Sequence, residues 1–210
     1  MAADAPEDPA GAVARVGVIG LGNVLMGDDA FGPWVVQTLL AGYAFPEDVA
    51  VQDLGTPGLD LIPYVTDLEA LVLVDTVRSE AAPGTLRLYR RDEILEHPPQ
   101  TRLSPHDPGV KEALLTAEFA GRGPREVLLV GAVPETTAMG VRLSPPMREA
   151  VPGAVAEVLK ELERLGRRAE PRKAPLSPDI WWACPPGIGP AFRGGARLPD
   201  IGPAFRGGKE

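Results

Sequence analysis

The sequence contains a single cysteine, Cys184, and one cysteine cannot build an internal disulfide framework. It has no apolar run near the roughly 20 residues that a membrane-spanning helix needs. It also lacks an excess of positive charge, since 29 acidic side chains outnumber 21 basic ones and give a net charge of −8. A general nucleic-acid binder and a protein drawn to anionic membranes are therefore not expected. The first residues, MAADAPEDPAGA, lack the basic and apolar regions of a signal peptide, so we expect a cytoplasmic protein.

Three kinds of catalytic residue are also missing or scarce. No G-x-S-x-G turn occurs, so the sequence offers no serine on a hydrolase nucleophile elbow. Cys184 is a poor nucleophile candidate, because it lies in the tail without a fixed neighbouring partner. The chain has only two histidines. His97 precedes two prolines and is expected to be a solvated loop residue, which leaves His106 as the histidine of interest.

The length of 210 residues gives room for one good core and an appendage. Residues 1–13 are acidic and contain proline, which is typical of a flexible lead-in, and residues 14–166 form the predicted domain. In residues 167–210 the composition changes to 8 prolines and 7 glycines, too many for a packed core. This tail has 8 Lys or Arg against 4 Asp or Glu, a net charge of +4. Because the whole chain has a net charge of −8, residues 1–166 carry −12. It includes two 13-residue copies that end in IGPAFRGG, and we expect a flexible, disordered arm.

Short apolar runs alternate with amphipathic stretches of helical length. The runs ALVLV at 70–74 and EVLLV at 126–130 are typical of central strands covered on both faces. TLRLY at 85–89 alternates in polarity, which favours an antiparallel edge strand. The alternation of strands and helices predicts an α/β fold with a mostly parallel sheet. We expect strands at 16–19, 49–52, 70–74, 85–89 and 126–130, and helices at 28–41, 59–65, 92–96, 110–119 and 145–165.

The stretch from Val16 to Gly32, VGVIGLGNVLMGDDAFG, predicts a buried strand, a glycine-rich loop and the start of a helix that carries Asp28 and Asp29. One interpretation is a dinucleotide site. Gly20-Leu21-Gly22 gives half of that fingerprint, but Leu25 holds the third glycine position and two acids would repel a phosphate. A second interpretation is that the loop presents an acidic ligand at the carboxyl edge of the sheet. In the third, both aspartates only cap the helix.

Three residues suited to metal binding fall at equivalent places. Asp29 follows the first strand, Asp75 ends the third, and His106 lies in a loop before a helix. Ligands of an open parallel sheet gather beyond the carboxyl ends of its strands, where these three are expected to converge. Two carboxylates and an imidazole suit a borderline divalent ion such as Ni²⁺ or Zn²⁺, with positions left open for water or substrate. The alternatives are that Asp75 caps the segment after it and that His106 is a solvated turn residue.

With these residues identified, the chain resembles the [NiFe]-hydrogenase maturation endopeptidases. The opening pattern of that family, G-x-G-N-x-L-x-x-D-D/E-x-x-G, matches Gly20 to Gly32. Four further blocks follow in the family's order, and the match covers about residues 14–166. They are an acidic residue before a G-T-x-G turn (Asp53 to Gly58), an apolar strand ending in aspartate (Leu71 to Asp75), an S-P-H ahead of a helix (Ser104 to His106), and an apolar strand running into G-x-x-P-E (Leu128 to Glu135).

The resemblance implies a three-layer α/β fold, with a twisted, mostly parallel sheet of about five strands between helices. It implies an aspartic-type endopeptidase that removes a C-terminal extension from the large-subunit precursor of a [NiFe]-hydrogenase after nickel insertion. Asp29, Asp75 and His106 match the family's nickel-sensing ligands and are the catalytic and metal-binding residues that it implies. The nickel is expected to be carried by the precursor rather than by the resting protein, which is expected to be a monomer. The expected substrate-binding residues are Gly22, Asn23, Asp28, Asp53, Gly55, Thr56 and Gly58.

Two other functions compete with this one. The first is a nickel-dependent binding factor or chaperone that recognises the precursor without cutting it. The second is a nucleotide-binding α/β protein, which Leu25 and the acidic start of the helix weaken. The tail matches nothing in the family pattern, and it is either a segment without function or a partner-binding arm. Its aromatic residues are spaced like anchors, at Trp181, Trp182, Phe192 and Phe205.

Overall fold

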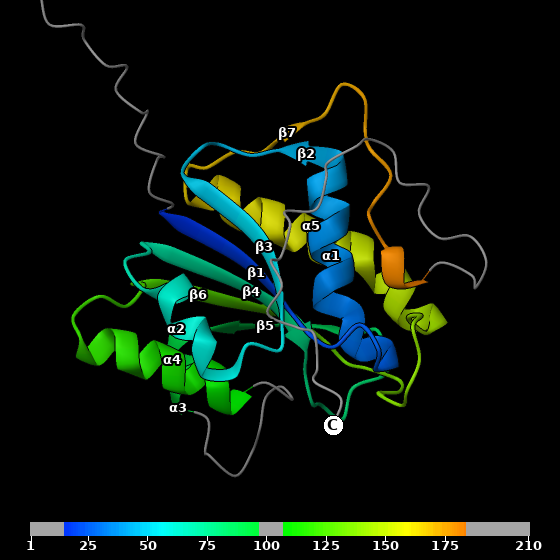
Figure 1. Cartoon of the computed structure of the whole chain (residues 1–210), viewed down its shortest axis with the longest axis horizontal. Helices are drawn as coiled ribbons and strands as arrows, with labels where there is room; N and C mark the ends of the chain where they lie inside the picture. The colour runs from blue at the N-terminus through cyan, green and yellow to red at the C-terminus, as the bar shows by residue number, and fades with distance from the viewer. Residues whose placement is uncertain (1–14, 97–106, 184–210) are drawn as a thin grey trace, which may run out of the picture.

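The computed structural model describes residues 15–96 and 107–183, and one five-stranded sheet forms its centre (Figure 1). The strand order is β3-β1-β4-β6-β5. Four strands are parallel, and β5 runs antiparallel to β6 at one edge. The predicted α/β class, the mostly parallel sheet and the antiparallel edge strand are confirmed. The strands are β1 (Val16–Leu21), β3 (Val49–Gly55), β4 (Ala70–Thr76), β5 (Leu86–Arg90) and β6 (Glu126–Ala132).

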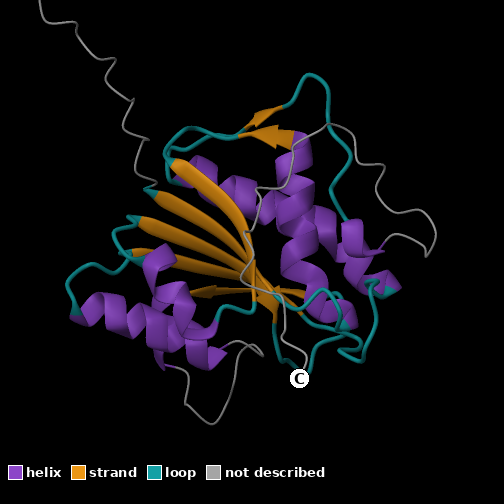
Figure 2. Cartoon of the chain, viewed as in Figure 1, coloured by secondary structure: helices purple, strands orange, loops and turns teal. Residues whose placement is uncertain are grey.

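Helices cover both faces of this sheet, which gives the fold three layers (Figure 2). On one face α1 and α5 share a buried cluster with Val18 and Val72 of the strands. On the other, α2, α3 and α4 pack against Leu73 and Leu129. Because both faces are covered, the central strands are near-continuous apolar runs. The helices are α1 (Phe31–Gly42), α2 (Ile62–Val65), α3 (Arg91–Glu96), α4 (Asp107–Phe119) and α5 (Pro145–Arg164).

The parallel strands run two or three residues further than their apolar runs predict. A backbone ladder needs no apolar side chain, so Asp75 and Thr76 still pair with β6 and lie within β4. The helix expected at 59–65 is a 3-10 turn, η2 (Gly58–Leu61), continued by α2. None of the helices in the described part of the chain is both long and apolar enough to span a membrane.

The start of α1 lies unusually close to the strands. A Cβ atom on Gly32 would stand 2.2 Å from the carbonyl oxygen of Leu21 in β1 and 2.5 Å from that of Val74 in β4. On the strand side, a Cβ on Gly20 would stand 2.7 Å from the Gly32 carbonyl oxygen. Only glycine fits both positions. The pair brings the turn that precedes α1, η1 (Gly27–Ala30), against the ends of β1 and β4.

Residues 167–183 run across the surface of the domain and pack on it. Arg167 pairs with Asp48 at 2.7 Å, and β7 (Glu170–Pro171) is antiparallel to β2 (Tyr43–Ala44). The chain then follows α1 to a last 3-10 turn, η3 (Trp181–Ala183), which lies beside that helix in Figure 1. The disordered arm that the composition predicts from residue 167 is therefore wrong for this part. Cys184 and the repeat that follows lie outside the described residues.

Candidate active site

Acidic side chains gather at the carboxyl edge of the sheet, where the parallel strands end. Asp53 stands near the end of β3 and Asp75 near the end of β4, while Asp28 and Asp29 follow β1 on η1. In an open parallel sheet this is the edge at which ligands bind. The topology thus brings together four of the acids that the sequence motifs single out.

Asp29 reaches from η1 to the end of β4 and is only 7% exposed. Its Oδ2 accepts the N–H of Asn23 at 2.9 Å, and its Oδ1 accepts the hydroxyl of Thr76 at 3.3 Å. Thr76 directly follows Asp75, whose carboxylate is fully buried and accepts the Thr76 N–H at 2.7 Å. Thr76 therefore orients both carboxylates, one through its hydroxyl and the other through its backbone.

The side chains of Asp28 and Asp29 do not cap η1 or α1. Within residues 27–42, where η1 and α1 lie, neither element has a side-chain capping hydrogen bond at its start. Asp75 pairs with Gly131 inside the β4–β6 ladder and so does not begin a new segment. The capping interpretations of Asp28 and Asp29 are therefore wrong, and Asp75 lies within β4 rather than ahead of a new segment.

Asp28 holds the loop that follows β6. It is completely buried, and its carboxylate accepts the N–H groups of Glu135, Thr136 and Ser144 at 2.6–3.0 Å. The Ser144 hydroxyl, which stands at the start of α5, also donates to Asp28 at 2.9 Å. The expectation that Asp28 contacts substrate is corrected, because its oxygens face this loop and are closed off from solvent. Asp28 is a structural residue that fixes η1.

The backbone N–H groups of Gly27 and Asp28 on η1, which a dinucleotide phosphate would need, are bonded within the chain. The N–H of Gly27 donates to the carbonyl of Gly140 and that of Asp28 to Thr136, both at the loop after β6. A Cβ on Gly22 would stand 1.8 Å from the carbonyl oxygen of Asp29, and Gly22 has a φ of +143°. The loop therefore closes on the chain's own backbone, and glycine is required for that contact rather than for a pyrophosphate. The nucleotide-binding hypothesis is wrong.

A pocket of about 290 Å³ opens beside Asp53. The Asp53 carboxylate accepts the N–H of Gly55 at 3.0 Å, and burial raises the pKa of Asp53 against the lowering effect of that hydrogen bond. Five expected substrate-binding residues line the pocket together with Val24 and two tryptophans of η3. The lining consists of Gly22, Asn23, Val24, Asp53, Gly55, Thr56, Trp181 and Trp182.

Of the remaining expected site residues, one lies elsewhere and one falls outside the described residues. Gly58 packs against α4, where a Cβ on Gly109 would stand 3.0 Å from the Gly58 Cα atom. His106, the third expected metal ligand, lies outside the described residues, as does His97. Among residues 15–96 and 107–183 the structure has no group of three Asp, Glu, His or Cys side chains arranged to hold a metal. A metal site here accordingly needs a further ligand beyond Asp29 and Asp75.

Sequence reasoning missed the structural roles of three residues that organise the site. Thr76 lies within a strand, and nothing in the local sequence indicates its hydrogen bond to Asp29. Ser144 precedes a helix, which suggests helix capping rather than a bond to Asp28. Trp182 is only 6% exposed and packs edge-on against Trp34 of α1, with ring centroids 6.4 Å apart. Aromatic residues in a proline-rich segment indicate a partner, whereas Trp182 packs on the domain and lines its pocket.

Comparison with known proteins identifies the family. The family model described as hydrogenase maturation protease matches residues 33–161. The chain belongs to the hydrogenase maturation protease family. It is therefore a peptidase with a processing role in hydrogenase maturation, as the resemblance implied.

Individual members of the hydrogenase maturation protease family support this. The hydrogenase expression/formation protein HupM of Azotobacter chroococcum is 37% identical over 164 residues, 78% of each chain. The hydrogenase 2 maturation protease of Escherichia coli is 32% identical, over 76% of this chain and 98% of that one. The structure of the E. coli hydrogenase maturating endopeptidase HybD aligns with a TM-score of 0.70 at 31% identity, over 75% of this chain and 98% of that one. Residues 167–183 lie beyond the range that the family model matches.

Proposed function

We propose that this protease removes a C-terminal extension from the large-subunit precursor of a [NiFe]-hydrogenase after nickel insertion. We further propose that it senses the nickel of the precursor through Asp29, Asp75 and His106. The observation that carries the proposal is the convergence of Asp29 and Asp75 on Thr76 at the carboxyl edge of the sheet. Membership of the family supports the reaction class.

The chemistry of the two carboxylates fits a cation supplied by the substrate. Asn23 and Thr76 donate to Asp29 through an N–H group and a hydroxyl, which orient the carboxylate without cancelling its charge. Both side chains are buried, and a charge is screened less in such a site than in water. A metal already held by the softer thiolates of the precursor would gain oxygen ligands here, which favours docking of the nickel-loaded form.

Asp29, Asp75 and His106 form an incomplete ligand set, so we expect the resting protein to bind nickel only weakly. Elemental analysis of the purified full chain is expected to find well below one nickel per chain. One tightly held metal per chain would contradict the proposal and would favour a protease with a resident catalytic metal.

Mass spectrometry of the precursor provides the decisive test. The cognate precursor is co-expressed with the full chain, without it, and with it in nickel-depleted medium. We expect shortening by a C-terminal peptide only when both the chain and nickel are present. If the nickel-loaded precursor binds the chain and stays intact, the protease assignment fails and the non-cutting chaperone is favoured. Cytoplasmic location and a monomeric state remain predictions.

A further inference from the structure

Residues 167–183 bring two tryptophans to the substrate side of the domain. Hydrogen bonds at the C-terminal end of α1 hold the segment: the N–H of Arg172 donates to the carbonyl of Gly42, and that of Leu176 to the carbonyl of Ala41. The segment starts beside the amino ends of the strands, where Arg167 pairs with Asp48, and it finishes at the opposite edge. Its main structural effect is therefore to add a wall to the pocket beside Asp53.

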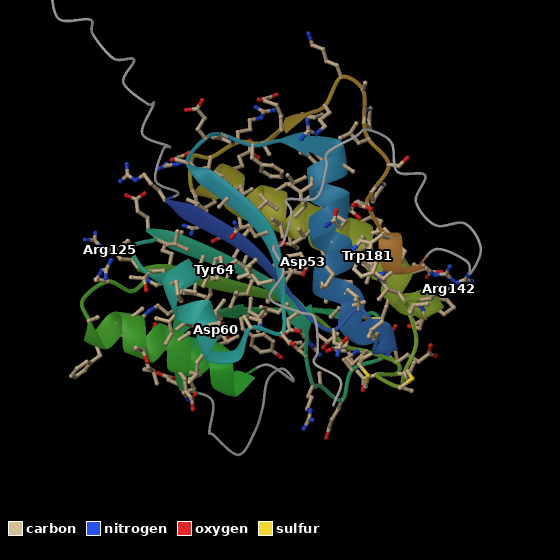
Figure 3. The ribbon with its side chains drawn as sticks, in the orientation of Figure 1. Asp53, Asp60, Tyr64, Arg125, Arg142 and Trp181 are labelled. Atoms are coloured by element: carbon tan, nitrogen blue, oxygen red, sulfur yellow. The ribbon has the colours of Figure 1, made fainter. Side chains whose placement is uncertain are left out.

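The two tryptophans of this wall differ in burial and in role. Trp182 is anchored, since it is almost completely buried and packs against Trp34 of α1. Trp181 packs edge-on against Trp182 with centroids 5.7 Å apart, and yet it is 58% exposed. An exposed tryptophan that lines a pocket offers a large aromatic surface to a bound group. Figure 3 shows Trp181 and Asp53 on the same side of the molecule, one beside α1 and the other on β3.

The charge of the pocket indicates which kind of group it binds. Asp53 is the only ionisable side chain among the lining residues, so the pocket carries negative charge next to indole rings. A carboxylate attracts a cation directly, and the face of a tryptophan ring attracts it through the ring quadrupole. The two glycines of the lining, Gly22 and Gly55, present backbone that a peptide can approach closely.

The pocket also adjoins one candidate catalytic carboxylate, Asp29. Asn23 lines it, and the N–H of the same residue donates to Asp29. A peptide side chain seated in the pocket would therefore place its own backbone near Asp29. We propose that Trp181, Trp182 and Asp53 form a subsite for a positively charged side chain of the precursor, close to the bond that is cut. This inference rests on the proposed processing function and names the chemistry of the substrate that the site selects.

Replacing Trp181 tests the subsite. Processing of the purified nickel-loaded precursor by full-length wild-type protein, Trp181→Ala and Trp181→Phe is measured against precursor concentration. We expect Trp181→Ala to raise KM about 5- to 10-fold with kcat retained, and Trp181→Phe to lie much closer to wild type. Leu176→Ala is the matched control, because Leu176 is 62% exposed on the same segment but does not line the pocket. A KM within twofold of wild type for Trp181→Ala would overturn the proposal.

Charge is tested on the precursor. Each Lys, Arg and His near the cleavage site is changed to Gln, one at a time. One of these changes is expected to raise the KM of the wild-type protein about as much as Trp181→Ala does, and to add little when combined with it. The proposal would be contradicted if the KM effects of the precursor change and of Trp181→Ala were fully additive, or if no basic residue of the precursor affected KM. A wild-type protein that leaves every precursor intact would instead refute the processing function, so the two failures are distinguishable.

Fluorescence gives a readout that does not depend on cleavage. The chain has three tryptophans, and all of them belong to the contacting set Trp34, Trp181 and Trp182. Addition of a synthetic peptide that spans the cleavage site is expected to change the emission of wild-type protein. The same peptide with its basic residues replaced by Gln should have little effect. Equal responses to both peptides would show that the pocket does not select positive charge.

Discussion

The two edges of the central sheet use their acidic residues in opposite ways. At the carboxyl edge Asp28 and Asp29 accept hydrogen bonds from backbone N–H groups and hydroxyls. At the amino edge the acids contact arginines. Arg15 pairs with Glu69 between the starts of β1 and β4, and Arg164 pairs with Glu126 at the start of β6. Acidic residues thus lie at both edges of one sheet, and the type of group that contacts them differs between the two edges.

Glu161 is the most buried acid of the amino edge, and it shows what pairing does to a carboxylate. Arg90 contacts it through two nitrogens at 2.5 and 3.0 Å, and Arg164 adds bonds of 2.9 and 3.1 Å. Burial alone would raise the pKa of Glu161, but the hydrogen bonds from Arg164 and Arg90 outweigh it and lower that pKa to about 2. A carboxylate held in this way is a structural group with little capacity left for a ligand.

Neutral donors have another consequence at the carboxyl edge. An N–H group or hydroxyl orients a carboxylate without cancelling its charge, so the acid can still attract a cation. Asn23 and Thr76 are donors of this kind to Asp29, and Asp53 faces a pocket. The comparison predicts that substitutions at the carboxyl edge remove activity, whereas those at the amino edge remove stability.

The largest expected effect is on processing. Asp29→Asn, Asp75→Asn and His106→Ala are each expected to lower the processing rate at least about 1000-fold, since each would remove a group that acts on the reacting centre. Mass spectrometry of the precursor over time measures this, with His97→Ala as the control expected to process normally. For the two Asn variants, thermal melting should change little, because Asn keeps an acceptor of similar shape. Processing at the normal rate would show that the residue is incidental.

Asp28 is the exception within the carboxyl edge, and its replacement sharpens the contrast. Asp28→Ala leaves buried donors of Glu135, Thr136 and Ser144 without their acceptor, so we expect it to lower the free energy of unfolding by about 3 kcal/mol. Urea unfolding measures the loss, and Asp28→Asn should cost less because one acceptor oxygen remains. An Asp28→Ala protein as stable as wild type would contradict a structural role.

At the amino edge, Glu161→Gln should lower the free energy of unfolding by about 2 kcal/mol at neutral pH and leave processing intact. The folded pKa of Glu161 lies below its ordinary value of 4.5, so its contribution is complete above pH 4.5 and is lost as the pH falls through about 2. Denaturant unfolding of both proteins over pH 2–7 is the measurement. If the difference in free energy of unfolding between the two proteins stayed constant from pH 2 to pH 7, the arginine contacts would not stabilise the charge of Glu161.

The smallest expected effect concerns Asp53. Burial raises its folded pKa, so its charged form opposes folding as the pH rises above the ordinary value of 3.8. Asp53→Asn is therefore expected to melt like wild type at low pH and at an equal or higher temperature at pH 7, while its KM for the precursor rises. Melting curves at both pH values provide the check. A variant that is less stable at pH 7 than wild type would mean that Asp53 serves the fold.

The sequence predicted the strands of the sheet closely, because a buried strand needs an apolar run that can be seen locally. The edge strand at 85–89 and the helix at 145–165 are found within one residue of their predicted ends. The strand ends beyond the apolar runs were missed, since backbone pairing extends past the last apolar residue. The order of the motifs also sufficed to recognise the family, as it is a property of the chain alone.

Only the tertiary structure decided what each acid does. Asp28 and Asp29 are neighbours in sequence, yet one is bound by residues 107–116 positions away and the other by Asn23 and Thr76. Trp182 likewise became part of the pocket through contact with Trp34, far earlier in the chain. Local composition predicts how much order a segment can support by itself, and it does not include the surface against which the segment packs. Partners that are distant along the chain are set by the fold, so the roles of these side chains followed from the structure.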